Sequence, residues 1–444
     1  MDITQILERV GDRPAMALAG LMVGLIFGFA AQRSQFCLRA ATVEFWRGKF
    51  WRLTSSNGSL GPRTAIWLLV FGIALAGTQL LLAYGHLAPD RIRQLSTTGT
   101  MSGAIIGGAL FGIGMVLARG CASRLLVLST TGNLRALVSG LILTVTAQAA
   151  LSGILSPARQ QLSALWTVPG DLRNLQLRLP SGTGLARGLV TIGLALFLAR
   201  RHRLPPLQTV AGAAVGGAVV LGWYLTAAIA ARSFDPVAVQ SVTFTGPSTD
   251  TLMVLIARPD VPLTFGIGLV PGVFAGSLLA TLLAGEFEIQ TFNERAPMPR
   301  YIAGAMLMGF GSMLAGGCAV GAGVTGGALM ASTAWVALIA MWGAAGLTDL
   351  LADRPPHSDS QARRPDRSAL FGRYPQSCFV ASRAPSARLW NLASTIVSCT
   401  SGTARGVDAK PQSVEAMTFS LPTTLANLQM RSATSSGCST STDA

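Results

Sequence analysis

The sequence predicts an all-α polytopic membrane protein, because its apolar residues form long runs and because it has too few charges to cover a soluble core. Of the 444 residues, 50% are hydrophobic and only 12% are charged, whereas average soluble domains carry about 25% charged residues. Mean hydropathy is +0.50. The 50 glycines fit the same class, since glycine lets membrane helices approach closely.

Nine apolar runs are long enough to cross a bilayer, which takes roughly 17–25 residues as a helix. They lie at about residues 16–35, 64–84, 101–119, 134–152, 184–200, 208–230, 263–284, 301–316 and 328–350. The first run is not expected to be a cleaved signal peptide, because its flank mixes acids and bases and its far end meets Arg33.

We expect a membrane transport domain at residues 1–353 and a different kind of segment after it. The domain is predicted to consist of two halves, at about 15–200 and 205–352. From Arg354 onward the chain is rich in Ser, Thr, Pro, Ala and Arg and has no run long enough to span. Residues 354–444 are therefore predicted to be a disordered low-complexity tail, or a misread frame, with no assigned function.

Basic residues gather in alternate gaps between the runs. They crowd the gaps after the first, third and fifth runs, whereas the other gaps are mixed in sign. By the positive-inside rule, this predicts an N-terminus outside and a C-terminus inside. The alternative reading of the net charge of +15, nucleic-acid binding, is not favoured, because the arginines fall between spans. The residues predicted to charge the inner mouth are Arg33, Arg39, Arg119 and Arg124.

An internal repeat is the most informative feature. Residues 107–121 read G-G-A-L-F-G-I-G-M-V-L-A-R-G-C, and residues 304–318 read G-A-M-L-M-G-F-G-S-M-L-A-G-G-C, with identity at eight positions. The span count predicts that the two copies run in opposite directions across the membrane. Inverted repeats with sites near the midplane recur in transporters. For Gly112, Gly114, Gly309 and Gly311 we expect helix packing rather than substrate contact.

Each copy of the repeat ends at Gly-Cys, and a segment too short to cross the membrane follows. Such segments are predicted to be short re-entrant helices, whose N-terminal N–H groups point at the cysteine and form an anion site. A thiol adds a weak S–H donor and a polarizable surface, which suits a soft anion. The residues predicted to support this site are Gly120, Ala122 and Ser123 in the first copy, and Gly317, Ala319 and Gly321 in the second.

The substrate path is predicted to be lined by Cys37, Cys121 and Cys318. Cys37 ends the first span in a similar setting, before a short amphipathic segment. The alternative for a lone cysteine in an apolar helix is a small buried hydrophobic residue. A zinc site is not expected, because no Cys-x-x-Cys occurs. We also expect no catalytic residue, no cofactor and no ATP-driven mechanism, since the chain has no G-x-x-x-x-G-K-[ST].

At these cysteines the chain resembles the YeeE/YedE sulfur-transport family of bacterial inner-membrane proteins. The resemblance rests on R-S-Q-F-C at residues 33–37, on A-R-G-C-A-S-R at 118–124 with G-N-L at 132–134, and on A-G-G-C-A-V-G-A-G at 315–323. It implies thiosulfate uptake through an hourglass of two related halves, with the three cysteines relaying the unmodified anion by S–H hydrogen bonds. It also suggests a cytoplasmic sulfur-carrier protein as a partner.

The chain departs from the family pattern at one position. The family motif usually reads Gly-Gly-Cys, and here Arg119 takes the place of the first glycine. This arginine would attract a dianion, narrow the path or anchor the helix, and it leaves other sulfur or selenium anions open as substrates. Two other classes stay open as well: a membrane-embedded sulfur-transfer protein that forms a cysteine persulfide, and a non-transporting scaffold.

Overall fold

A computed structural model describes residues 11–50, 60–178, 180, 182–233, 237–256, 263–290 and 298–352. The predicted tail, 354–444, lies outside the described residues. Within them, nine spans are long and apolar enough to cross a membrane, as the sequence predicted, and almost all regular structure is helical. The long helices of these spans are α2 (Asp12–Ser34), α4 (Pro62–Ala83), α6 (Met101–Leu117), α8 (Leu134–Ser152), α11 (Thr183–Arg201), α12 (Pro206–Ala230), α14 (Phe265–Ala284), α15 (Met298–Leu314) and α16 (Ser332–Ala352).

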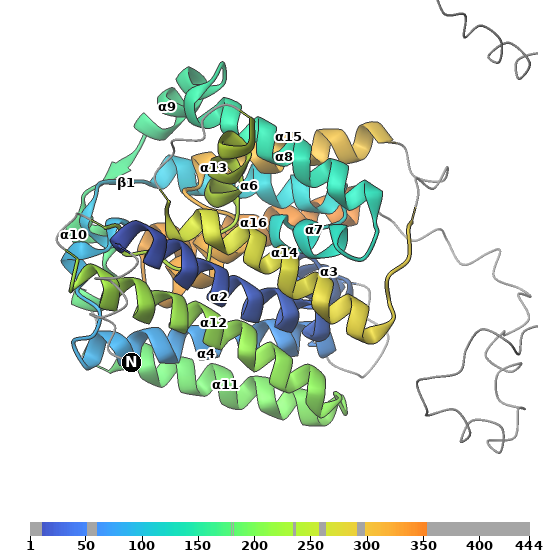
Figure 1. The fold of residues 1–444 in the computed structure, drawn as a ribbon, viewed down its shortest axis with the longest axis horizontal. Coiled ribbons are helices and arrows are strands. Elements are labelled where there is room, and N and C mark those ends of the chain that lie inside the picture. Colours follow the sequence, from blue (N-terminus) through green and yellow to red (C-terminus); the bar gives the residue numbers. More distant parts are fainter. Residues whose placement is uncertain are drawn as a thin grey trace, which may run out of the picture. The chain divides into compact units, whose positions relative to one another are not determined.

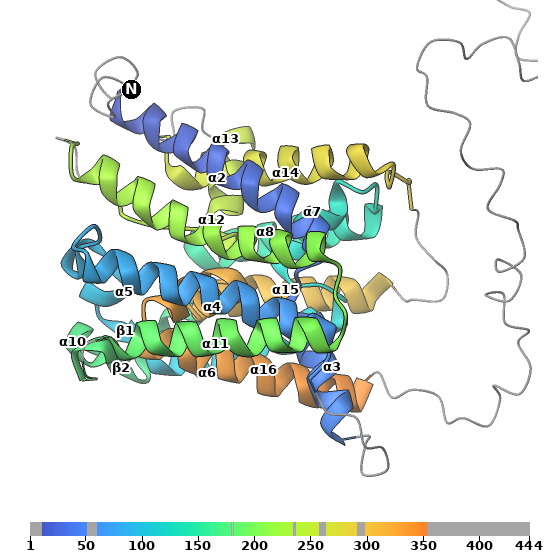
Figure 2. The same cartoon turned by 90° about the horizontal axis from the view of Figure 1, so that it is seen from below.

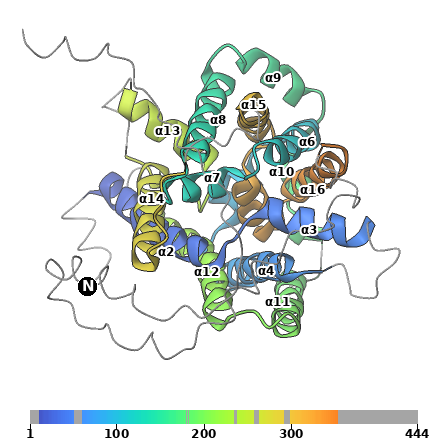
Figure 3. The ribbon, with the colours of Figure 1, turned by 90° about the vertical axis from the view of Figure 1, so that its right-hand side faces the viewer.

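Four shorter helices lie among the long ones. They are α3 (Leu38–Phe50), α7 (Ala122–Ser129), α13 (Thr245–Ile256) and the π-helix η3 (Ala319–Gly326). The segments after Cys121 and Cys318 are thus short helices, as expected, whereas α13 was not anticipated. Figure 3 shows α7 near the middle of the bundle, with long helices around it.

The connections at one end of the bundle carry the remaining elements. They are η1 (Pro89–Arg91), α5 (Arg93–Ser96), α9 (Ser156–Ala164), α10 (Gly170–Arg173) and η2 (Leu175–Arg178), together with the strands β1 (Gly99–Thr100) and β2 (Thr167–Val168). The two strands pair antiparallel, with Gly99 opposite Val168. Figure 1 and Figure 2 show these elements gathered at the end of the bundle opposite α3.

Helix contacts in the first half of the bundle are matched by contacts in the second half. The match follows when α2, α3, α4, α6, α7 and α8 are set against α12, α13, α14, α15, η3 and α16 in that order. The α2–α14 contact then corresponds to the α12–α4 contact, and the α6–α16 contact to the α15–α8 contact. In the same way, the α3–α16 contact corresponds to the α13–α8 contact, and the α7–α14 contact to the η3–α4 contact. All of these helix pairs pack together. Helix α11, which packs on α4, has no counterpart among the described helices.

The α6–α15 pair shows the same correspondence at single residues. A Cβ atom on Gly107 would lie 2.5 Å from the backbone nitrogen of Ala315, and one on Gly304 would lie 2.6 Å from that of Ala118. Both helices therefore need glycine for their backbones to meet. Gly114 and Gly311 take part in the same contact. Gly112 packs on Met341 and Gly309 on Leu143, so the packing role predicted for these four glycines is confirmed.

Candidate functional site

Each of the three predicted path cysteines directly precedes a short helix. Cys37 comes before α3, while Cys121 and Cys318 are the N-cap residues of α7 and η3. Both N-caps are extended, at φ −84° and ψ 168° for Cys121 and φ −78° and ψ −177° for Cys318. The first N–H groups of a helix have no partner within the helix, so this geometry turns free donors toward the cysteine position. All three are free thiols.

The sulfur of Cys318 accepts a hydrogen bond from the backbone of the short helix that follows it. The N–H of Gly321 donates to Cys318 Sγ at 3.4 Å. At Cys121, by contrast, the side chain makes no capping hydrogen bond to α7. Because the Gly321 donor is fixed by the backbone, it holds the Cys318 thiol in place at the start of η3.

Cys37 and Cys121 are brought together by the fold. Their side chains are within hydrogen-bonding reach of each other, and Cys121 Sγ also lies 3.4 Å from Ser123 Oγ. Cys121 is 1% exposed, whereas Cys37 is partly exposed. The sequence suggested Cys121 and Cys318 as the matched pair, but the direct thiol contact of Cys121 is with Cys37.

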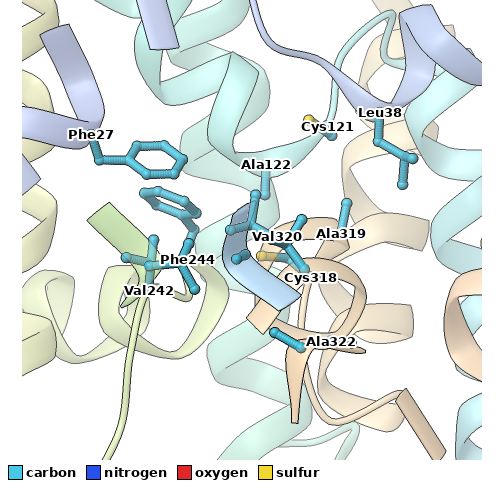
Figure 4. Close-up of a cluster of buried hydrophobic side chains, with 14 of the residues drawn as sticks. Phe27, Leu38, Cys121, Ala122, Val242, Phe244, Cys318, Ala319, Val320 and Ala322 are labelled. Atoms are coloured by element: carbon cyan, nitrogen blue, oxygen red, sulfur yellow. The ribbon is translucent and has the colours of Figure 1, made fainter. Parts of the chain in front are cut away.

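Cys318 lies in the same buried cluster as Cys121. Helices α7 and η3 pack on each other, and Figure 4 shows Cys121 and Cys318 in one buried cluster with Ala122, Ala319 and Val320. Cys318 is 1% exposed. Cys37 packs against this cluster, and of the three cysteines it alone is partly exposed.

Arg124 adds a positive charge to the cysteine pair. It follows Cys121 in the first turn of α7, and its guanidinium interacts electrostatically with both Cys37 and Cys121. Its Nη1 atom is buried and has no hydrogen-bond partner among the described residues. A buried donor without an acceptor costs about 1–3 kcal/mol, and more when it is charged. Such an atom favours an anionic ligand beside the thiols.

The other predicted inner-mouth arginines are half-buried or exposed. Arg33 is half-buried, with its guanidinium 6.0 Å from the centre of the Phe29 ring. Arg39 is half-buried in the first turn of α3. Arg119 is exposed, and it has a left-handed φ of 55°, where the second copy of the repeat has Gly316 at φ 78°. Arg119 therefore occupies a helix-ending position that glycine suits better.

The residues predicted to support the site lie around the starts of α7 and η3. Gly120, Ala122, Ser123, Ala319 and Gly321 are buried, and Gly317 is half-buried. A Cβ atom on Gly317 would lie 2.8 Å from the backbone nitrogen of Ala322, while one on Gly120 would lie 3.1 Å from the Leu125 side chain. The glycine before each cysteine thus lets the chain turn closely onto the short helix that follows.

Thr243 lies at the site but was not singled out from the sequence. It belongs to an extended segment before α13, and a Cβ atom on Gly321 would overlap its Oγ1 atom. The segment is held by a 2.6 Å hydrogen bond from Thr325 Oγ1 to the Val242 carbonyl, and by the Phe244 ring on Phe27. No motif marks this threonine, and the repeat as aligned does not reach it. Extending the comparison to the segments before α3 and α13 would have found it.

Metal ligands do not gather anywhere in the described part of the chain. No group of three or more His, Cys, Asp or Glu side chains there is close enough to hold a metal ion.

The sequence of the chain is similar to a family of known proteins and to two curated relatives. The family described as Sulphur transport matches residues 33–347, a range that includes all three cysteines. A thiosulfate transporter, TsuA of Escherichia coli (strain K12), is 26% identical over 358 residues, covering 74% of this chain and 92% of that protein. The thiosulfate transporter TsuA of Spirochaeta thermophila is 28% identical over 339 residues, covering 73% of this chain and 95% of that protein.

Proposed function

The chain belongs to the Sulphur transport family, and on that premise we propose that it carries thiosulfate across the bacterial inner membrane. The anion passes Cys318, Cys121 and Cys37 by replaceable S–H hydrogen bonds and is not chemically changed. Both relatives named above are thiosulfate transporters, which supports this substrate over other sulfur or selenium anions.

The chemistry of the thiols suits a doubly charged soft anion. Removing a dianion from water is costly, so a path must supply donors that bind it. The donors must also be weak enough to release it, since conduction fails when a site binds too tightly. Neutral thiols at successive positions provide modest donors and a polarizable surface. The paired thiols of Cys37 and Cys121 are the single observation that carries the proposal.

Arg124 supplies the attraction that neutral thiols lack. Its buried Nη1 has no acceptor among the described residues, so an anion that reaches the Cys37–Cys121 pair gains a charge-assisted hydrogen bond. A single arginine compensates only part of the charge of a dianion, which leaves the bound state weak enough for release. Arg33, Arg39 and Arg119 form the charged inner mouth beyond this point.

The membrane orientation and the relationship of the halves are part of the same proposal. The matched helix contacts support two inverted halves, at about 15–200 and 205–352, with the path between them. The distribution of basic residues supports a periplasmic N-terminus and a cytoplasmic C-terminus. Thiosulfate then enters on the Cys318 side and leaves on the Cys37 side.

Growth on thiosulfate tests this function. The chain, with and without residues 354–444, is expressed in a bacterium unable to import sulfate or thiosulfate, with thiosulfate as the only sulfur source. Both forms are expected to restore growth, since the predicted path lies within residues 1–353. Failure of both forms, with the protein present in the inner membrane, would contradict thiosulfate uptake and favour another sulfur or selenium anion.

A second candidate function is sulfur transfer, because a cation beside a thiol pair also favours a reactive thiolate. The thiolate of Cys37 would attack the sulfane sulfur of thiosulfate. A new S–S bond forms the cysteine persulfide, and the old S–S bond breaks as sulfite leaves with its electron pair. A cytoplasmic sulfur-carrier protein would then accept the sulfane sulfur. Persulfide on the protein and free sulfite after exposure to thiosulfate, found by mass spectrometry, would favour this candidate.

A further inference from the structure

The short helix η3 has a polar neighbour that the cysteine path does not use. Thr243 lies so close to Gly321 that a Cβ atom on the glycine would overlap the Thr243 hydroxyl. The N–H of Gly321 in turn donates to Cys318 Sγ. Gly321 therefore contacts both the Thr243 hydroxyl and the Cys318 thiol.

Thr243 occupies a setting that parallels the setting of Cys37. Phe36 and Leu38 are buried at 3% and 1% exposure, and Cys37 between them is partly exposed. Val242 and Phe244 are buried at 0% and 1%, and Thr243 between them is again partly exposed. Each triplet leads into a short helix, α3 or α13, and these helices correspond in the matched contacts of the two halves.

The residue that lies beside the middle residue of each triplet also corresponds between the two halves. Cys37 lies beside Arg124, three residues after Cys121, and Thr243 lies beside Gly321, three residues after Cys318. The Cys37 side thus has a thiol and a cation, whereas the Thr243 side has a hydroxyl and a glycine without charge. Helix α13 itself presents no basic side chain, because its sequence is TGPSTDTLMVLI.

The Thr243 hydroxyl has no partner in the described part of the protein. Its neighbour Thr325 bonds the Val242 carbonyl at 2.6 Å and so fixes the backbone of the segment. Thr243 makes no comparable bond to a described residue, although it is held in place by buried neighbours on both sides. A fixed, partly exposed hydroxyl beside the thiol of a transport path is a ready donor to an anion.

We propose that Thr243 is a substrate-binding residue, which donates its hydroxyl hydrogen to the anion before the anion reaches Cys318. This inference rests on the proposed function, because it adds a fourth binding position to the cysteine path. The order of donors is then hydroxyl, thiol, thiol, and finally thiol with guanidinium. An anion therefore meets neutral donors first and the charge of Arg124 last, which draws it from the Thr243 side toward Cys121.

Thr243→Val tests the hydroxyl, because valine keeps the branched shape and removes the donor. Uptake of ³⁵S-thiosulfate is measured in proteoliposomes that contain the purified full chain. We expect the KM to rise about tenfold, the effect of losing a hydrogen bond to a charged group, and Thr243→Ser to keep a KM within about twofold of the wild type. The matched control is Thr191→Val on α11, the helix without a counterpart, which should leave the KM unchanged.

Labelling of Thr243→Cys provides a measurement that does not depend on transport. A membrane-impermeant charged maleimide, added from the side of the N-terminus, should label this variant at one site more than the parent protein. Thiosulfate should slow that labelling, and sodium chloride at equal ionic strength should not. Equal labelling rates with and without thiosulfate, or an unchanged KM in Thr243→Val, would overturn the assignment. If the wild type takes up no thiosulfate, the proposed function fails, and protection from labelling still decides whether the anion binds at Thr243.

Discussion

The thiols of Cys37 and Cys121, far apart in the sequence, lie within hydrogen-bonding reach of each other beside the guanidinium of Arg124. This contact joins the start of α3 to the start of α7 at the centre of the bundle. It leaves one thiol buried and the other partly exposed. A small anion bound there would touch two soft donors and one charge at once, and each donor can be tested by itself.

Cys121→Ala is expected to abolish thiosulfate uptake without unfolding the protein. The substitution removes the donor that bridges Cys318 and Cys37, and the loss of one buried sulfur costs only about 1 kcal/mol of stability. An uptake assay checks the loss of transport, and a thermal melt of the purified protein checks that the variant is still folded. Normal uptake by the alanine variant would contradict a path through this thiol.

Cys37→Ser separates the two candidate functions. Serine keeps a hydrogen-bond donor at the same place, so the relay should retain measurable uptake, with a raised KM because a hydroxyl is less polarizable than a thiol. A persulfide cannot form on serine. If the function is sulfur transfer through a persulfide on Cys37, this variant should be inactive and should release no sulfite.

Arg124→Gln should weaken thiosulfate binding more than any change at the exposed Arg119. Glutamine keeps an N–H donor and removes the charge beside Cys37 and Cys121. A charged hydrogen bond contributes about 1.5–3 kcal/mol, so the KM should rise between about tenfold and a hundredfold. Arg119→Gln is the matched control, since it removes one arginine from the turn just before α7. A similar KM for both variants would show that only the overall charge of the inner mouth matters.

Arg119→Gly is expected to stabilise the protein and to change uptake far less than Arg124→Gln does. Arg119 has φ 55°, a left-handed conformation that costs a residue with a side chain about 1 kcal/mol relative to glycine. The melting temperature in detergent should therefore rise. Gly316→Ala, at the corresponding place with φ 78°, should lower it by a similar amount. A lower melting temperature for Arg119→Gly would show that the arginine side chain makes a stabilising contact.

Gly107→Val and Gly304→Val should destabilise the protein to a similar extent. Each adds side-chain atoms where the α6 and α15 backbones meet, at 2.5 Å and 2.6 Å from backbone nitrogens, and such overpacking costs about 1–3 kcal/mol. Gly217→Val on α12 is the control, because a Cβ atom there has nothing within 4 Å. Thermal melting compares the three variants. An effect at one glycine alone would argue against equivalent packing roles for the two helices.

The sequence predicted the spans and the glycine contacts well, because both depend on local composition. A run of apolar residues has to cross the bilayer wherever it packs, and the repeat around Gly107 and Gly304 could be read residue by residue. The positions of Cys121 and Cys318 before short helices followed from the same repeat. These features needed no knowledge of which helices are neighbours.

Features that depend on distant contacts were not predictable in this way. The contact of Cys37 with Cys121 joins two residues far apart in the chain, which no local pattern encodes. The left-handed conformation of Arg119 was hidden because arginine is an unusual residue for that position. Thr243 precedes a helix of mixed polarity, α13, whose sequence gives neither a span nor a repeat. For Cys37 and Thr243 the missing information is a neighbour far away in the chain, and for Arg119 it is the conformation of its own backbone.

Uptake of thiosulfate that carries ³⁵S in its sulfane position tests the central claim most directly. The labelled thiosulfate is added outside proteoliposomes that contain the wild-type protein or Cys121→Ala. The sulfur species inside the vesicles are then separated by chromatography. We predict intact labelled thiosulfate inside the wild-type vesicles and only background label with Cys121→Ala. Equal accumulation by both proteins, or label bound to the wild-type protein with free sulfite and no internal thiosulfate, would contradict transport of the intact anion through the cysteines.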